Sequence, residues 1–294
     1  MSNGKEVTVF FELQARFDEE NNVFWANRLK DAGAKVSFGV ENLKVHSKLL
    51  QIHRVGSKTE NLITYIGTGN FNESTAKIYE DLALLTCDPD IAKEAQQVFE
   101  LLEKKNVKTD FNKLLVSPYN TRSGFMSLID NEINNAKNGL SAGIKIKINN
   151  LVDSDIIRKL YEASQAGVKI QMVVRGICCL VTDDPELSAN IEIRSIVGRY
   201  LEHSRFFIFE NGGEPLYYIG SADMMERNLD KRVEVAVPIQ RKKLQIQLED
   251  IFNILWRGNV KSRMIDGNQS NIYYRDNNPD FYSQDEMYNY YKLD

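Results

Sequence analysis

Cysteine and histidine are scarce in this chain, and long apolar runs are absent. The three cysteines, Cys87, Cys178 and Cys179, give neither an even disulfide count nor a C-x-x-C metal spacing. Cys178 and Cys179 stand in an apolar stretch, so we expect reduced thiols in the core and a cytoplasmic location. No run approaches the length of a membrane span and the N-terminus shows no signal-peptide pattern, so we expect no transmembrane segment.

Positive charge is also in short supply. The 37 Lys and Arg are outnumbered by 41 Asp and Glu, which gives a net charge of −4 and a pI near 5.6. A general nucleic-acid or anionic-membrane surface is therefore not expected. A polyanionic ligand would have to be held by a local cluster of cations. The 294 residues are enough for two ordinary domains.

One structural unit occurs twice along the chain. Tyr65–Asn70 (YIGTGN) matches Tyr218–Asp223 (YIGSAD), and the same register places Asp81–Leu84 over Glu234–Val237. A His-Ser-cation triplet opens a strand before each copy, and a glycine-led apolar strand lies further upstream. The triplets are His46-Ser47-Lys48 and His203-Ser204-Arg205, and the upstream strands begin at Gly4 and Gly167.

The two copies differ at their start. The second is preceded by an expected strand, Ile144–Asn149, and an amphipathic helix, Asp153–Ala166, closed by Gly167. Only Met1-Ser-Asn stands before Gly4. We therefore expect an excised fragment whose N-terminal boundary cuts the first unit. The alternative is that the copies diverged and the first never had this pair.

The predicted fold is α/β, with two units facing each other across a pseudo-two-fold axis, each with a mixed or largely parallel sheet. We place the units at 1–108 and 109–294, with a polar boundary at Asn106–Asn112. The second ends in a Tyr-rich tail from Asn268, in which Ser283 and Glu286 form a capping box before a short helix. The other expected strands are Val7–Glu12, Lys35–Val40, His46–Ile52 and Leu62–Gly67, and the other expected helices are Asp18–Ala32, 89–104 and Leu244–Trp256.

The two triplets suggest phosphoryl chemistry. Side chains alternate along a strand, so His46 and Lys48 point the same way, as do His203 and Arg205. A neutral imidazole can attack phosphorus while an adjacent cation offsets charge on the phosphoryl oxygens. The turns Gly67–Asn70 and Gly220–Asp223 let the backbone approach a phosphate closely.

Paired H-x-K and glycine-turn motifs resemble the phospholipase D superfamily, in which a histidine forms a covalent phosphoenzyme. That pattern places an Asp several residues after the Lys, where this chain has His53 and Glu210, and the second triplet has Arg205 in place of Lys. Longer strings instead resemble the polyphosphate kinase family, up to about Gly267. They are Glu12–Glu20, Lys44–Lys48, Ile66–Asn72, Ser117–Arg122, Val174–Gly176, Tyr200–His203, Glu210–Gly213 and Arg232–Val235.

The resemblance implies reversible transfer of the ATP γ-phosphoryl group to inorganic polyphosphate through a phosphohistidine at His46. His203 matches the second catalytic histidine near the nucleotide, and Tyr79 and Arg175 match nucleotide-contacting positions. Arg16 matches a phosphate and magnesium position, so Mg²⁺ is the expected cofactor. Further expected phosphate contacts are Lys48, Arg205, Arg232 and Asn70.

Other interpretations stay open. A phospholipase D-like phosphodiesterase or nuclease is one, and a folded fragment that binds ATP or polyphosphate without turnover is another. Arg16 could instead pair with Asp18 or Glu19 in an exposed ion pair, and Tyr79 could be an edge residue. For the full-length enzyme the resemblance implies ATP or ADP and polyphosphate as partners, no nucleic acid, a homo-oligomer and peripheral membrane association. The isolated fragment is expected to be weakly active or inactive.

Overall fold

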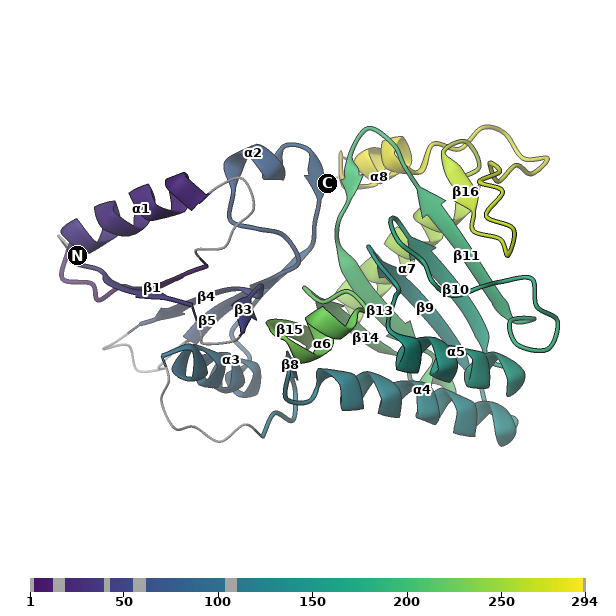
Figure 1. The fold of residues 1–294 in the computed structure, drawn as a ribbon, viewed down its shortest axis with the longest axis horizontal. Helices are drawn as coiled ribbons and strands as arrows, with labels where there is room; N and C mark the ends of the chain where they lie inside the picture. The colour runs from purple at the N-terminus through teal and green to yellow at the C-terminus, as the bar shows by residue number, and fades with distance from the viewer. Residues whose placement is uncertain (1–2, 13–18, 40–42, 55–61, 104–109, 293–294) are drawn as a thin grey trace.

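The structure, a computed structural model, describes residues 3–12, 19–39, 43–54, 62–103 and 110–292. Its helices and strands form two α/β units, with the first to the left in Figure 1 and the second to the right. The α/β class predicted from the sequence is confirmed. The predicted boundary between residues 108 and 109 lies outside the described residues.

The second unit is built on one mixed sheet. Strands β9, β10 and β11 run parallel, whereas β13, β14, β15 and β16 run antiparallel to their neighbours within the unit. The sheet order is β16-β11-β10-β9-β13-β14-β15-β3, and β8 also pairs with β15. The bounds are β3 (Lys44–Val45), β8 (Leu115–Ser117), β9 (Gly143–Ile148), β10 (Lys169–Val174), β11 (Ile191–Ile196), β13 (Arg205–Phe209), β14 (Leu216–Gly220), β15 (Arg232–Pro238) and β16 (Ser262–Met264).

Helices cover both faces of this sheet, so most side chains of its central strands are buried. Helices α4 (Thr121–Lys137) and α5 (Ser154–Gln165) lie on one face, where the rings of Phe125 and Phe207 are 4.5 Å apart. Helix α7 (Lys242–Arg257) lies on the other, where the rings of Phe206 and Phe252 are 6.2 Å apart. Successive residues of β13 therefore fill two separate cores.

Helix ends follow the capping residues in the sequence. The Asp153 side chain accepts hydrogen bonds from the backbone N–H groups of Asp155 and Ile156 at the start of α5, and Gly167 adopts a φ of +93° just after its end. Asp88 caps α3 (Pro89–Leu102) in the same way. The predicted helices over these segments are confirmed, as is a terminal helix, α8 (Ser283–Lys292).

The first unit holds its strands in separate sheets. Strands β1 (Thr8–Phe11) and β2 (Lys35–Phe38) form a parallel pair, joined by helix α1 (Glu19–Asp31). Strands β4 (Lys48–His53), β5 (Leu62–Gly67) and β7 (Ala83–Thr86) form an antiparallel sheet. In the second unit β9 connects the parallel and antiparallel parts, and the described part of the first unit has no strand in that place.

The chain at His46 is not part of a strand, contrary to the sequence-based expectation. Strand β3 ends at Val45 and β4 begins at Lys48. The N–H groups of His46 and Ser47 both donate to the carbonyl oxygen of Val233, at 2.9 Å each, so the ladder stops there. His46 therefore lies where the chain crosses from the sheet of the second unit to that of the first.

The thiol prediction was partly wrong. All three cysteines are free, as expected, but Cys179 is exposed rather than buried in the core, and so is Cys87. Cys178 is half-buried and packs against the core beneath α5. Cys178 and Cys179 follow β10 in an extended loop, so their side chains point in opposite directions, one toward the core and one toward the surface. None of the described helices has both the length and the apolarity to cross a membrane.

Glu94 on α3 joins the two units. Its buried carboxylate accepts hydrogen bonds from the N–H groups of Asn112, at 2.8 Å, Lys113, at 3.1 Å, and Leu114, at 2.8 Å. Because these donors would lose their acceptor, we expect Glu94→Ala to lower the free energy of unfolding by about 2–3 kcal/mol. Urea titration measures the change. The control is Lys93→Ala at an exposed position of the same helix, and equal stability of both variants would contradict the prediction.

Candidate active site

Two short strand pairs bring the units together. Strand β3 of the first unit pairs in parallel with β15 of the second, and β12 (Leu201–Glu202) of the second pairs in parallel with β6 (Tyr79–Glu80) of the first. After each pair the chain reaches a histidine whose N–H is bonded across the units. His203 and Ser204 donate to the carbonyl oxygen of Glu80, as His46 and Ser47 donate to Val233. The predicted pseudo-two-fold relation is therefore visible in matched contacts.

Each imidazole is hydrogen-bonded to an acid of the other unit. His46 Nδ1 lies 2.9 Å from Glu234 Oε2, and His203 Nδ1 lies 2.8 Å from Asp81 Oδ1. Glu234 and Asp81 occupy equivalent places in the repeat. The two units thus exchange carboxylates, and neither unit contains a complete histidine–acid pair.

Matching hydroxyl groups hold the two acids. Ser221 Oγ donates to Glu234 Oε2 at 2.5 Å, and Thr68 Oγ1 donates to Asp81 Oδ1 at 2.6 Å. Asn228 Nδ2 also donates to Glu234, at 2.7 Å. Burial acts to raise the pKa of both acids, but their bonded histidines and hydroxyl groups more than offset it, so the pKa of Glu234 and of Asp81 lies below its usual value. Both groups therefore stay ionised as hydrogen-bond acceptors.

These contacts fix the chemistry of the rings. A carboxylate on Nδ1 places the proton of a neutral imidazole on that nitrogen and its lone pair on Nε2. Burial lowers the pKa of both His46 and His203 below the ordinary value, although their acid partners act in the opposite direction. The side chains remain 23% and 12% exposed. Each ring is thus a neutral base with an accessible edge.

The cation of each triplet turns back to its own histidine. Lys48 Nζ donates to the carbonyl oxygen of His46, and Arg205 donates to that of His203 at 2.6 Å. Arg205 also lies 3.2 Å from Asp223. Burial, together with the charge of Arg205 and against the opposing effect of Glu234, lowers the pKa of Lys48 to about 7.

Electrostatic effects connect the two half-sites. The cations of both triplets, Lys48 and Arg205, lower the pKa of His46. The same two cations lower the pKa of His203. Asp81, the partner of His203, raises the pKa of Lys48. The charges of each half-site therefore act on the titrating groups of the other.

Other predicted contact residues also gather here. The Tyr79 ring lies 4.9 Å from the His203 ring, measured between centroids. Arg175 is half-buried and donates from Nε to Asn149 Oδ1 at 3.0 Å. Arg232 lies 3.8 Å from Glu234. Burial lowers the pKa of both arginines, and Arg205 acts on both in the same direction.

The two glycine turns differ at their ends. Asn70 is exposed on the turn after β5, next to Gly69, where an added Cβ would lie 2.2 Å from Asp81 Oδ2. The equivalent residue, Asp223, is buried and accepts hydrogen bonds from Asn149, Asn150 and Arg205. Close packing thus requires glycine beside Asp81, and Asn70 faces solvent at this edge.

One expected contact residue is not among the described residues, and Arg122 and His53 have other surroundings. Arg16 lies outside the described residues. Arg122 bonds both oxygens of Asp153 and of Asp230, so it ties α4 to α5 and to α6 (Glu226–Asp230) rather than facing the site. His53 is exposed, because it ends an edge strand.

Two important acids were missed by the sequence analysis as partners of the histidines. Asp81 and Glu234 appeared there only as aligned members of the repeat. Each lies two residues after a predicted contact residue, Tyr79 or Arg232. Side chains two residues apart in extended backbone point to the same face. An acid at equivalent repeat positions was the available signal.

The described residues do not build a cation site. Among residues 3–12, 19–39, 43–54, 62–103 and 110–292, no three His, Cys, Asp or Glu side chains gather to hold a metal ion. The acids nearest the histidines, Asp81 and Glu234, already accept hydrogen bonds from imidazole and hydroxyl groups. The donor set therefore suits a polyanion better than a bare cation.

Family models match most of the chain. The model described as polyphosphate kinase C-terminal domain 1 matches residues 1–109, and the model described as polyphosphate kinase C-terminal domain 2 matches residues 114–284. Curated polyphosphate kinases from Vibrio parahaemolyticus and Escherichia coli K12 are 50% and 46% identical over 99% of this chain. The chain spans 42% of the length of each of these relatives.

Solved structures agree with this similarity. Polyphosphate kinase from Porphyromonas gingivalis superposes with a TM-score of 0.91 and 39% identity, over 99% of this chain and 45% of that one. Phosphatidylserine synthase from Haemophilus influenzae superposes with a TM-score of 0.55 at 7% identity, over 99% of this chain and 89% of that one. The second likeness concerns the fold alone.

The pairing of each histidine with an acid of the other unit predicts how the pKa of each imidazole responds to loss of that acid. Glu234→Gln removes a charge that raises the pKa of His46, so the pKa of His46 should fall further below its ordinary value. NMR titration of the imidazole signals measures the shift. Asp81→Asn is the matched control, because it should lower the pKa of His203 and leave His46 nearly unaffected. An unchanged His46 titration in Glu234→Gln would rule out the assigned pairing.

Proposed function

The chain belongs to the polyphosphate kinase family, and we propose that it carries the site at which the γ-phosphoryl group of ATP passes to inorganic polyphosphate through His46. The observation that carries this proposal is the pair of imidazoles, each bonded at Nδ1 to an ionised acid of the other unit. That arrangement prepares Nε2 of His46 as a nucleophile. The second ring, His203, can serve as a proton donor or charge stabiliser.

In the first step, the lone pair of His46 Nε2 attacks the γ-phosphorus of ATP. The N–P bond forms as the bond from phosphorus to the bridging oxygen of ADP breaks, and ADP leaves with that electron pair. The Nδ1 proton stays between His46 and Glu234, so the carboxylate offsets the positive charge that the ring gains. Glu234 is 0% exposed, which keeps this interaction out of bulk water.

In the second step, a terminal phosphate oxygen of polyphosphate attacks the phosphorus on His46. The N–P bond breaks, its electron pair returns to Nε2, and the polymer gains one phosphate. The reverse sequence forms ATP from ADP, since both steps exchange one phosphoryl bond for another. His203 acts beside the transferred group as a proton donor or charge stabiliser, with Asp81 holding its ring.

Cations around the rings would balance the charge of the phosphates. Phosphoryl transfer depends on positioning and on neutralising the non-bridging oxygens. Lys48 and Arg205 serve this role from the two triplets, and Arg175 and Arg232 from the surrounding strands and loops. Tyr79, in contact with His203, suits a nucleotide base or ribose next to that ring. We assign the nucleotide to the His203 side for this reason.

Magnesium enters the proposal only with the nucleotide. The described carboxylates do not form a site for it, and a guanidinium such as that of Arg16 cannot ligate a cation. Mg²⁺ would then be held by phosphate oxygens of ATP, as is common for this ion, and no step above passes through it. The expected homo-oligomer, the cytoplasmic location and the exclusion of nucleic acid remain predictions.

Loss of the nucleophile gives the first test. His46→Ala in the full-length protein should abolish the acid-labile label left on the protein by ATP radiolabelled at the γ-position, because no Nε2 remains to accept the group. Gel filtration in denaturant, before and after acid treatment, measures the label. His53→Ala is the control, since His53 is exposed, and it should label normally. Normal labelling of His46→Ala would refute the assignment.

Loss of the second histidine should separate binding from rate. His203→Ala should still bind ATP but lower kcat by roughly 10²–10⁴-fold, the usual contribution of a positioned acid or base. Calorimetric titration with ATP and a steady-state assay measure the two quantities. Turnover equal to that of the unaltered protein would remove His203 from the mechanism.

A further inference from the structure

The strand pair that carries His203 has a second, buried face. In the parallel pairing Glu202 stands opposite Glu80, and Leu201 opposite Tyr79. Because side chains alternate along a strand, Tyr79 faces the His203 ring, whereas Glu80 and its partner Glu202 point to the opposite side of the pair, toward Lys147. Glu202 is only 2% exposed, and the Glu80 side chain 23%. Two carboxylates therefore lie side by side behind the ring.

A single buried cation sits between these acids. Lys147 on β9 is 1% exposed, and its Nζ lies 2.7 Å from Glu80 Oε2 and 3.1 Å from Glu202 Oε2. It also donates to Ser204 Oγ at 2.8 Å, next to His203. Two like charges this close in a buried place need such a partner to stay together. Lys147 thus ties both strands of the pair to the central sheet.

The equivalent place behind His46 is built differently. There the paired residues are Val45 and Val233, which pack together as apolar side chains next to the core. The pseudo-two-fold axis thus repeats the histidine–acid pairs but not their support. A charged support is costlier to bury than an apolar one, so its presence on the His203 side alone points to a role specific to that half-site.

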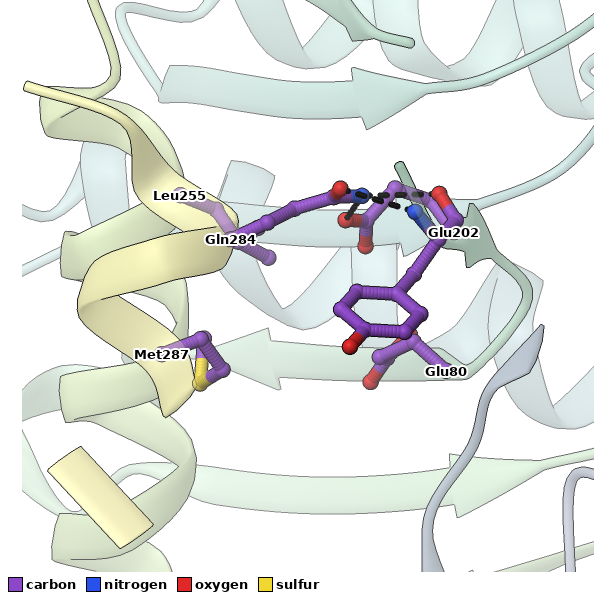
Figure 2. Close-up of a pocket in the computed structure, with 6 residues that line it drawn as sticks. Glu80, Glu202, Leu255, Gln284 and Met287 are labelled. Atoms are coloured by element: carbon purple, nitrogen blue, oxygen red, sulfur yellow. Dashed lines mark hydrogen bonds between the residues drawn. The ribbon is translucent and has the colours of Figure 1, made fainter. Parts of the chain in front are cut away.

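The C-terminal helix completes this support. Figure 2 shows Gln284 of α8 reaching across to the segment that leads into β12. Gln284 Nε2 donates to Glu202 Oε1 at 2.7 Å and to the carbonyl oxygen of Tyr200 at 2.8 Å, and its Oε1 accepts from the Tyr200 N–H at 2.9 Å. A Cβ added at Gly198 would lie 2.4 Å from Gln284 Oε1, so a larger residue there would displace the Gln284 amide.

We propose that Gln284 is a positioning residue for His203, so that the C-terminal helix α8 is a working part of this half-site. The chain of contacts runs from Gln284 to Glu202, from Glu202 through Lys147 to Glu80, and from the strand pair to the His203 ring. Strands β6 and β12 have only two residues each, so their own ladder is short. Side-chain bonds at the back therefore add to the hold that Asp81 has on the ring.

Loss of these contacts would lower the rate of phosphoryl transfer more than the affinity for ATP. A displacement of about 1 Å in a catalytic group can cost up to 10²-fold in rate. His46 is supported by Val45, Val233 and Glu234 and has no contact with α8 in this chain of bonds. The effect should thus be confined to His203. The kinetic part of this inference rests on the proposed function, whereas its structural part does not.

Gln284→Met tests the inference, because methionine keeps the length of the side chain and its helix propensity and removes only the hydrogen bonds. The readout is the nitrogen NMR pattern of the imidazole rings, which distinguishes the two neutral tautomers. The chain has 3 histidines, so each ring can be assigned by substitution. We expect His203 to change from a single Nδ1–H tautomer to a mixture, with His46 unchanged. Asn289→Ala, at an exposed position of α8, is the control and should leave both rings as they are.

Glu202→Gln provides a second variant on the other side of the same hydrogen bond. It keeps an acceptor for Gln284 but loses the charge that holds Lys147, so the same change at His203 is expected. An unaltered His203 pattern in both folded variants overturns the inference. A change that affects His46 equally also overturns it, because that outcome means general loosening of the fold.

Kinetics of the full-length protein complete the test. Gln284→Met should lower kcat by about tenfold with little change in KM for ATP, as expected for a misplaced ring. Wild-type kcat would reject the positioning role even with the proposed function intact. If no variant and no wild-type protein transfers phosphate, the proposed function fails, and the NMR pattern still decides the structural part.

Discussion

The exchange of acids between the two units is the contact on which the site depends. Glu234 reaches His46, and Asp81 reaches His203, each across the pseudo-two-fold axis. A buried carboxylate is tolerable only when several donors satisfy it. Glu234 has three such donors in His46, Ser221 and Asn228. The same hydrogen bonds that join the two units therefore also set the tautomer of the two imidazole rings.

Duplication of one unit explains why the two half-sites are built alike. The differences between them indicate different roles. Both have a histidine, an acid, a hydroxyl group and a cation in matching contacts. Next to the acids, however, one side has Arg232 and the other has Tyr79. An arginine suits phosphate and an aromatic ring suits a nucleotide, and this difference supports the proposed placement of the nucleotide on the His203 side. Behind His46 lie apolar valines, whereas behind His203 lies a charged cluster. A substitution in one support can therefore affect one ring and not the other.

The sequence predicted elements whose signals are local and missed those set by tertiary contacts. Helices α3 and α5 were found because Asp88 and Asp153 cap an amphipathic pattern. Helix α4 was missed: its buried positions Phe125, Ile129 and Ile133 keep helical spacing, but serine, asparagine and glycine lie between them. The break at His46 depends on the carbonyl oxygen of Val233, far away in the chain. The repeat predicted the gathering of the site residues, yet pairing of each histidine with the opposite unit's acid required the fold.

The cations around the two imidazoles are buried or half-buried in a chain that is acidic overall. The net charge is −4, and bulk attraction for phosphate is therefore weak. Burial instead lowers the pKa of Lys48 to about 7, and lowers that of Arg175 and Arg232 as well. A lowered pKa means that these groups lack full compensation of their charge by water or by acids. In the proposed function, phosphate oxygens would supply the missing compensation, so that phosphate binding and protonation of Lys48 would be linked.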